Sequence, residues 1–330
     1  NADDNDYTLD DSAHLTLNSD KVLSDTAVAR VPRVDITVSR SHLSLVNNER
    51  GFTASDVEAL CDIGASTKTA ETKRKRCIGE KGIGFKSVFA ISDTPYVLSN
   101  YFSFRFEKTA AEGIGCLVPH WVNPQSFPRV DEDSGEAVKT PHPGTCIVLP
   151  LHNRTDANAL KHTAVWKTIE SLDSVVLLFL RQLRVLTVSF ASRVDNDSEL
   201  GEQIDARHET YRRKIRKEGM PPNVVIRDEH SIDGTTEFVA EFKVAQYMAP
   251  IPANVIHTAP RHKQKFSTTE LACAFPLNSD GSADASTVHK VFVFLPTRAY
   301  GLRFPLHAEF SLPSSREEVL RDSAWNQWLV

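Results

Sequence analysis

Apolar residues recur along the chain with two spacings, one typical of strands and the other typical of helices. Residues 34–45 alternate between apolar and polar around a turn at Ser39–Ser41, which predicts a β-hairpin. Residues 53–63 repeat apolar positions at helical spacing between a Thr53 or Ser55 cap and Gly64, so they predict a helix. Further elements are two helices between residues 160 and 183, and strands at 102–106, 144–151, 185–190, 224–227, 238–244, 271–277 and 291–295.

The succession of these elements predicts an α+β chain with two domains. A length of 330 residues is enough for about two domains, each with its own core. Polar residues dominate between 191 and 220, so the predicted domains are residues 1–192 and 193–330. Residues 310–320 predict a loop that enters a helix, where Arg316 would oppose the helix dipole. A contact between the Arg316 side chain and an anion elsewhere would explain a cation at this position. An ordinary surface position is the alternative.

The stretch from residue 78 to residue 93 carries a candidate phosphate site. Its glycines, Gly79, Gly82 and Gly84, are spaced G-x-x-G-x-G before a helical apolar pattern. Glycines let backbone N–H groups approach an anion closely, and a helix start offers unpaired donors. A phosphate-binding turn and a plain turn before a core helix are equally compatible with three glycines. The stretch is not a P-loop, because Phe85 stands between the last glycine and Lys86. Lys86 is expected to contact either phosphate or solvent.

Composition narrows the classes of function. The hydrophobic and charged fractions, 41% and 25%, are those of a soluble globular protein. A net charge of −5 gives no support for general nucleic-acid binding. No apolar run reaches membrane-spanning length and no signal peptide is visible, so we expect a cytoplasmic or nuclear protein without a membrane partner. Five scattered cysteines without a C-x-x-C pair favour free thiols over a zinc site: Cys61, Cys77, Cys116, Cys146 and Cys273.

Several polar positions are candidate ligand contacts, and each has a plainer alternative. Asn1 and Asp4 stand three residues apart and either hold Mg²⁺ through oxygen and water or form a solvated helix end. Asn47 ends a strand before a turn, where side chains often contact ligands, although it also fits a simple turn. Thr145 fits beside the phosphate site or as an ordinary β-branched strand residue. The basic run at 73–76 contacts phosphate, directs import or is solvated.

Four motifs in this order resemble the Bergerat-fold ATPases, the superfamily of DNA gyrase, the ninety-kilodalton heat-shock chaperone, histidine kinases and MutL. They are NADDN, the N-x-x-x-G of NNERG, GEKGIG and the Gly-Thr pair at 144–145. The resemblance implies a two-layer α/β sandwich, in which helices cover a mixed sheet, with a lid at residues 64–78. It implies ATP and Mg²⁺ as ligands, with the metal on Asn1. The implied nucleotide contacts are Asn1, Asp4, Asn47, Gly51, Ser66, Thr67, Gly79, Gly82, Ile83, Gly84, Phe85 and Thr145.

Longer phrases resemble a narrower family, the sacsin and No Vein group of chaperone-like ATPases. ALCDIGASTK, GEKGIGFKSVF, FLPTRAYGLRF and LPSSREEV are among them, and they extend over nearly the whole chain. In the heat-shock chaperone, a middle-domain loop much like LPSSREEV brings an arginine to the γ-phosphate. The resemblance therefore implies that residues 193–330 form a smaller strand-rich α/β domain like that middle domain, with Arg316 as a catalytic residue.

Two positions depart from the family pattern. Asn47 replaces the aspartate that reads adenine, so its amide oxygen accepts a hydrogen bond without charge assistance. Glu49 replaces a glycine. The family's general-base glutamate stands four residues before the Mg²⁺-binding asparagine, a position that precedes Asn1. Because Asn1 is not a methionine, we expect upstream residues in the parent protein, and we expect this chain to bind ATP but hydrolyse it weakly or not at all.

The function implied is an ATP-binding, chaperone-like module with Mg²⁺-dependent hydrolysis in the parent protein. Its implied partners are ATP or ADP, protein clients or co-chaperones, and a second copy in a nucleotide-dependent dimer. The alternative is a nucleotide-independent scaffold that keeps the fold for protein interaction, which Asn47 and the absent base favour. A DNA-transaction enzyme of the gyrase or MutL type is a third interpretation, but the acidic balance speaks against nucleic acid.

Overall fold

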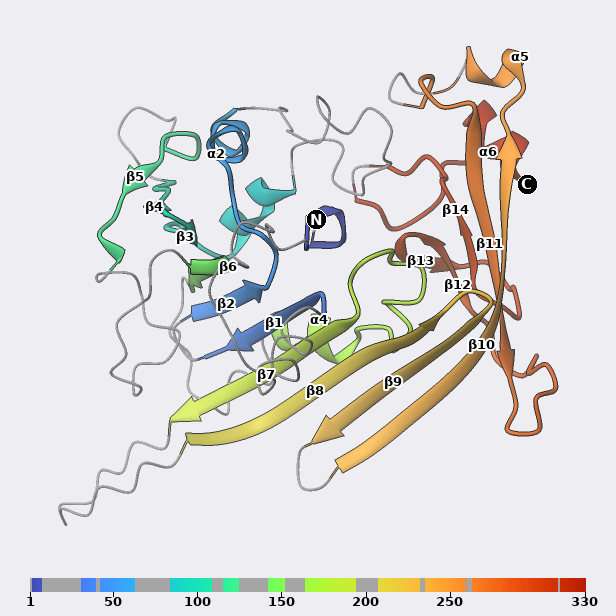
Figure 1. Ribbon diagram of the computed structural model, residues 1–330, viewed down its shortest axis with the longest axis horizontal. Helices are drawn as coiled ribbons and strands as arrows, with labels where there is room; N and C mark the ends of the chain where they lie inside the picture. The colour runs from blue at the N-terminus through green and yellow to red at the C-terminus, as the bar shows by residue number, and fades with distance from the viewer. Residues whose placement is uncertain are drawn as a thin grey trace, which may run out of the picture. The chain divides into compact units, whose positions relative to one another are not determined.

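The computed structural model divides the chain into two compact units, which we describe separately (Figure 1). The first unit comprises Asn1–Ser171, Gln182–Lys214 and Glu229–Thr236, and the second comprises Leu172–Arg181, Ile215–Asp228 and Glu237–Val330. The boundary between the units cuts across three strands, and it does not follow a single linker. The structure describes residues 2–7, 31–39, 42–62, 84–108, 115–124, 142–151, 164–193, 207–231, 235–257, 259, 263–313 and 315–330.

Strands dominate the described residues, and they form one mixed sheet of fourteen strands in the order β13-β12-β14-β11-β10-β9-β8-β7-β1-β2-β6-β3-β4-β5. β1 pairs in parallel with β7 and β12 in parallel with β14, whereas most other described pairs are antiparallel. The strands are β1 Arg33–Val38, β2 His42–Asn47, β3 Tyr96–Asn100, β4 Phe102–Arg105, β5 His120–Trp121, β6 His142–Pro150, β7 Val185–Arg193, β8 Arg207–Met220, β9 Asn223–Ser231, β10 Thr235–Pro250, β11 Thr268–Leu277, β12 Lys290–Val293, β13 Leu295–Ala299 and β14 Leu306–Ala308.

Helices are few and short among the described residues, and the predicted helix-covered α/β sandwich is therefore wrong. The longest of them, α2, has eight residues. Its prediction is confirmed, because Thr53 caps it and exchanges hydrogen bonds with Asp56 in a capping box. The helices are α2 Ala54–Cys61, α4 Ala164–Glu170, α5 Ala253–Ile256 and α6 Ala324–Leu329, with 3₁₀ segments η1 Ala2–Asp4 and η4 Phe85–Ala90.

Two stretches account for much of this difference. The second helix predicted before residue 183 is absent, because Val175–Leu180 forms successive turns with nearly every side chain buried. The polar stretch after residue 206 forms β8, in which Arg213 and Lys217 point inward and donate to the carbonyls of Ile169 and Leu180. Long basic side chains bury their apolar stems, so this strand lacks a visible apolar alternation. The division at residues 192 and 193 stays a prediction.

The first unit is built on the neighbouring strands β1, β2, β6 and β3, which follow one another in Figure 1. The hairpin of β1 and β2 confirms the alternation seen in the sequence. One cluster of buried side chains, including Val38, Leu149 and Phe190, receives Val165 and Ile169 of α4. A second cluster combines residues of α2, η4, β3 and β4 with the segment that follows β4: Val57, Phe89, Val97, Phe104 and Phe106.

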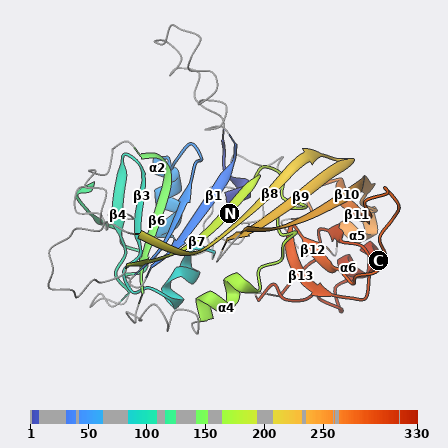
Figure 2. The same cartoon turned by 90° about the horizontal axis from the view of Figure 1, so that it is seen from below.

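The second unit surrounds β11, which pairs with β10 on one side and β14 on the other. Val291, Val293, Ala308 and Phe310 form its buried cluster. The short helices α5 and α6 lie side by side (Figure 2). The helix predicted directly after Arg316 is absent, because α6 begins only at Ala324. The conflict between Arg316 and a helix dipole therefore does not arise.

Candidate functional site

A row of polar side chains crosses three adjacent strands of the first unit. The strand registers set Asn47 of β2 opposite Thr145 of β6, and Thr145 opposite Ser99 of β3. The hydroxyl oxygens of Ser99 and Thr145 are 2.6 Å apart, and both residues are buried. The backbone N–H of Phe52 donates to Ser99 Oγ at 2.8 Å. The structure thus brings together two predicted contacts, Asn47 and Thr145, and adds Ser99 from β3, the strand on the other side of β6.

Glu49 joins this row from the turn that follows β2. Only 7% of its surface is exposed, and the Thr145 hydroxyl donates to its Oε1 at 2.5 Å. Burying a carboxylate is costly unless it is hydrogen-bonded, so Thr145 is a partner that helps to retain it. In the sequence Glu49 is only a departure from a glycine pattern, and its hydrogen bond with Thr145 becomes visible in the structure alone.

The Tyr7 hydroxyl donates a hydrogen bond to the side-chain oxygen of Asn47. Its hydroxyl lies 2.9 Å from Asn47 Oδ1 and 2.9 Å from the carbonyl oxygen of Ala2. Burial raises the pKa of the Tyr7 phenol well above its ordinary value; the nearby charges of Glu49 and Asp3 raise it further, and the hydrogen bond to Asn47 opposes them. Tyr7 is therefore a neutral donor at physiological pH, and no sequence motif pointed to it.

Asp3 anchors the N-terminal segment. Its buried carboxylate accepts from the backbone N–H groups of Gln182 and Leu183, at 2.6 and 2.8 Å. Asp4, the predicted nucleotide contact, is half-buried beside it in η1. Asn1, the predicted metal ligand, lies outside the described residues. Asp4 was the acidic residue singled out from the sequence. The carboxylate that anchors this segment belongs to its neighbour, Asp3.

Two glycines next to the row permit close backbone approaches. Gly144 has φ +142°, and a Cβ there would lie 2.2 Å from the carbonyl oxygen of Asn47. Gly51, a predicted contact, has φ +84°, and a Cβ there would lie 2.5 Å from the side-chain amide of Asn100. That amide donates to the carbonyl of Phe52 at 3.0 Å. Both positions need glycine for conformation and for space.

Most of the glycine-rich stretch cannot be compared with its prediction. The lid at 64–78 and the predicted contacts Ser66, Thr67, Gly79, Gly82 and Ile83 lie outside the described residues. Gly84 has ordinary helical φ and ψ, and it precedes the six-residue 3₁₀ segment η4 rather than an α-helix. Phe85, a predicted contact, packs against Phe106 with ring centroids 5.6 Å apart.

Lys86 points inward in this structure. Its ammonium donates to the carbonyl oxygens of Leu60 at 2.6 Å and Cys116 at 2.8 Å, and it lies 5.2 Å from the ring centroid of Phe106. Burial lowers its pKa, and the thiols of Cys61 and Cys116 oppose that shift. Lys86 is thus bound within the protein, which differs from both sequence interpretations, a phosphate contact and a solvated side chain.

Arg316 belongs to the second unit. Its backbone has φ +61°, and its N–H donates to the carbonyl of Pro313 at 3.2 Å. It lines a cavity of about 390 Å³ with Leu295, Thr297 and Leu312 among other residues. Its role toward a phosphate stays a prediction.

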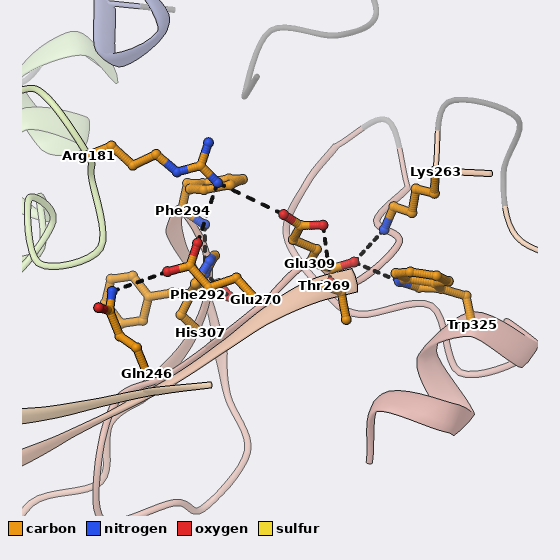
Figure 3. Close-up of polar contacts among 10 residues, drawn as sticks. All are labelled: Arg181, Gln246, Lys263, Thr269, Glu270, Phe292, Phe294, His307, Glu309 and Trp325. Carbon is orange, nitrogen blue, oxygen red and sulfur yellow. Dashed lines mark hydrogen bonds and ion pairs between the residues drawn. The ribbon is translucent and has the colours of Figure 1, made fainter. Parts of the chain in front are cut away.

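A second polar cluster lies wholly within the second unit (Figure 3). Arg181 lies 3.5 Å from Glu270 and 3.9 Å from Glu309, and its guanidinium stands 4.4 Å from the centroid of the Phe294 ring. Thr269 donates to the Glu309 carboxylate at 3.1 Å, while Trp325 Nε1 and the Lys263 ammonium donate to the Glu309 carbonyl. The cluster joins an arginine to two carboxylates and ties β11 to β14, so we interpret it as structural.

Two absences apply to the described part of the chain. No three His, Cys, Asp or Glu side chains there gather in a group that could hold a metal ion. None of the helices seen there combines the length and the apolar character needed to cross a lipid bilayer.

Parts of the chain resemble known proteins in sequence. Residues 36–107 match the sacsin domain, a range that contains β2, Glu49, Gly51 and Ser99. The chain is 33% identical over 309 residues to the protein NO VEIN of Arabidopsis thaliana, which covers 91% of this chain and 10% of that protein. The chain thus spans about a tenth of that relative's length. A crystal structure of the N-terminal domain of a DNA repair protein aligns with a TM-score of 0.38 and 9% sequence identity. The alignment covers 94% of this chain and 88% of that one. By these two sequence matches, the chain is similar to proteins of the sacsin and No Vein group.

Proposed function

We propose that the first unit is the ATP-binding part of a chaperone-like module. The observation that supports this most is the buried, hydrogen-bonded row of Ser99, Thr145 and Glu49 beside Asn47. Asn47 and Thr145 are positions to which the motif resemblance assigns a nucleotide base, and register brings them together from distant parts of the sequence.

The phosphates and Mg²⁺ would lie toward the glycine-rich turn. In this proposal the backbone N–H groups of residues 82–85 hold the phosphates and Asn1 holds the metal, with Asp4 next to the nucleotide. Mg²⁺ supplies charge neutralisation for the phosphates when it is bound. Arg316 is the proposed contact of the γ-phosphate, as the LPSSREEV resemblance implies.

Nucleotide binding is the activity proposed for this chain. Protein clients or co-chaperones and a nucleotide-dependent dimer are the partners that this proposal implies. A cytoplasmic or nuclear location belongs to the same proposal.

Calorimetry and thermal-shift measurements with ATP and Mg²⁺ test the proposal. We expect heat of binding and a raised melting temperature, both reduced when EDTA removes the metal. Thr145→Val removes the hydroxyl that donates to Glu49, so we expect at least tenfold weaker binding. Thr187→Val makes the same change at another buried strand position of this unit and should bind normally. An absence of both heat and thermal shift at millimolar ATP would refute the proposal.

A nucleotide-independent scaffold is the second candidate, and one observation favours it. Asn47 Oδ1 accepts from Tyr7, Thr145 donates to Glu49, and Lys86 donates to two carbonyls, so these polar groups are satisfied within the chain. Asn47→Ala separates the candidates, because it should weaken ATP binding if the first proposal holds. Partner binding that survives this change, in a chain without a nucleotide response, would support the scaffold.

A further inference from the structure

We propose that the cavity beside Arg316 in the second unit binds a free apolar α-amino acid, such as leucine. Its volume of about 390 Å³ is that of a site for a small ligand. The residues that line it belong to the second unit, so it shares no residue with the polar row of Ser99, Thr145 and Glu49 in the first unit. Occupation of this cavity requires no nucleotide.

Four aliphatic residues form an apolar wall of the cavity: Val293 at the end of β12, Leu295 and Pro296 at the start of β13, and Leu312. Val293 belongs to the buried cluster of the second unit and Leu312 packs against that cluster, so the wall is anchored in the core. Leu295 is 38% exposed, so apolar surface remains open to a ligand. Such a wall favours an aliphatic side chain, whose burial supplies the driving force for binding.

The polar part of the lining carries both signs of charge. Among the described residues that line the cavity, Arg316 is the cation and Glu317 the anion, and both are exposed. A guanidinium binds a carboxylate, and a carboxylate binds an ammonium group. An α-amino acid has both of these groups on one carbon, next to its side chain. A fatty acid, a primary amine or a nucleotide lacks at least one of the three features, so the lining matches an apolar zwitterion.

Both charged side chains have bonding capacity for a ligand. In the described part of the chain, Glu318 pairs with Arg298 at 3.2 Å, whereas no hydrogen bond or ion pair engages the carboxylate of Glu317. Arg316 has a further interaction within the chain. A guanidinium carries five N–H donors, so it can bind a ligand carboxylate in addition.

The backbone of Arg316 is held in a conformation that residues with a side chain rarely adopt. Its φ is +61°, and its N–H donates to the carbonyl of Pro313 at 3.2 Å. Such conformations persist where the surrounding structure imposes them, and they concentrate at ligand sites and switch regions. The turn keeps Arg316 and Glu317 at the same cavity as the first residues of β13.

Saturation-transfer difference NMR of the whole chain, without nucleotide, tests the proposal. We expect L-leucine to bind saturably with a dissociation constant of about 0.1–5 mM, because the ligand is small and the charged groups are exposed. Glycine lacks the side chain and should bind at least about tenfold more weakly. L-Leucinamide lacks the carboxylate and 4-methylpentanoate lacks the ammonium group, so each should bind about three- to fivefold more weakly than L-leucine.

Paired variants assign each charge of the ligand to a side chain. Glu317→Gln should weaken L-leucine about three- to fivefold and leave 4-methylpentanoate unchanged, because that ligand has no ammonium group. Arg316→Gln should weaken L-leucine to a similar extent and leave L-leucinamide unchanged, because that ligand has no carboxylate. Glu318→Gln and Arg321→Gln remove exposed charges nearby in the chain that do not line the cavity, so both should match the unmodified chain.

Four outcomes would overturn the proposal. The first is an absence of saturable L-leucine binding up to about 10 mM. The second is equal binding of L-leucine, L-leucinamide and 4-methylpentanoate, which would show that the charges do not recognise the ligand. The third is 4-methylpentanoate alone binding as tightly as L-leucine, because the site would then take a carboxylate such as a peptide C-terminus. The fourth is an equal loss for Glu317→Gln and Glu318→Gln, which would reflect general surface charge. None of them bears on the proposed ATP site, which its own calorimetry tests.

Discussion

Gly144 supports the end of β6 in a way that a single methyl group should disrupt. Its φ of +142° belongs to a region that essentially only glycine adopts, and a side chain there costs about 1–3 kcal/mol. An added Cβ would also stand 2.2 Å from the Asn47 carbonyl oxygen, a backbone atom of the paired strand. Relief of such a clash requires the strands to shift and costs about 1–3 kcal/mol more. We therefore expect Gly144→Ala to lower the free energy of unfolding by about 2–6 kcal/mol.

Two other glycines supply the matched controls. Gly281 and Gly301 also have positive φ, +81° and +86°, but a Cβ at either would meet nothing within 4 Å. Alanine there should cost only the conformational strain, about 1–2 kcal/mol. Gly51→Ala should fall between the extremes, because its Cβ would displace the Asn100 side chain and its hydrogen bond to Phe52. Urea denaturation followed by circular dichroism gives the four values. Equal losses for Gly144→Ala and Gly281→Ala would show that the close approach of β2 and β6 carries no energy.

Three further predictions concern single groups. The Tyr7 pKa is raised in the folded state, so the unfolded chain ionises first as pH rises above about 10 and stability falls there. Tyr7→Phe should be about 1 kcal/mol less stable at pH 8 and lose this disadvantage by pH 11, as urea midpoints would show; a constant gap would contradict it. Burial raises the pKa of the Cys146 thiol to about 12, so maleimide labelling and mass spectrometry should find it unmodified in the native protein at pH 7.5 and modified in urea. Labelling of Cys146 at the rate seen in urea would refute this. Asp3→Asn removes the charge that accepts two backbone N–H groups and should cost about 1–2 kcal/mol in urea denaturation, whereas an unchanged midpoint would mean that the anchor is dispensable.

The sequence predicted the elements whose signals are local. The first hairpin follows from alternation over twelve residues, and α2 follows from Thr53 and the capping box that it forms with Asp56. The segment Val175–Leu180 was misread because a short apolar run can be a buried helix or buried turns with the same residues. β8 was missed because its inward positions carry arginine and lysine.

The candidate site shows the same limit. Asn47 and Thr145 were predicted from motifs, and their meeting depends on a strand register that only the structure gives. Tyr7 and Ser99 have no motif, since each contributes one hydroxyl that gains meaning from partners far away in the chain. Glu49 was noticed as an irregularity, and such a break in a pattern could serve as a signal for a site-specific role.

The ammonium of Lys86 bonds two separate segments of backbone at once. Its ammonium donates to the carbonyl of Leu60 in the last turn of α2, where a positive charge offsets the helix dipole, and it also donates to the carbonyl of Cys116. An anion that attracted this side chain would withdraw the charge from the end of the helix and loosen the residues there. Acetylation of Lys86 would do the same without any ligand, because a neutral amide cannot replace the ammonium.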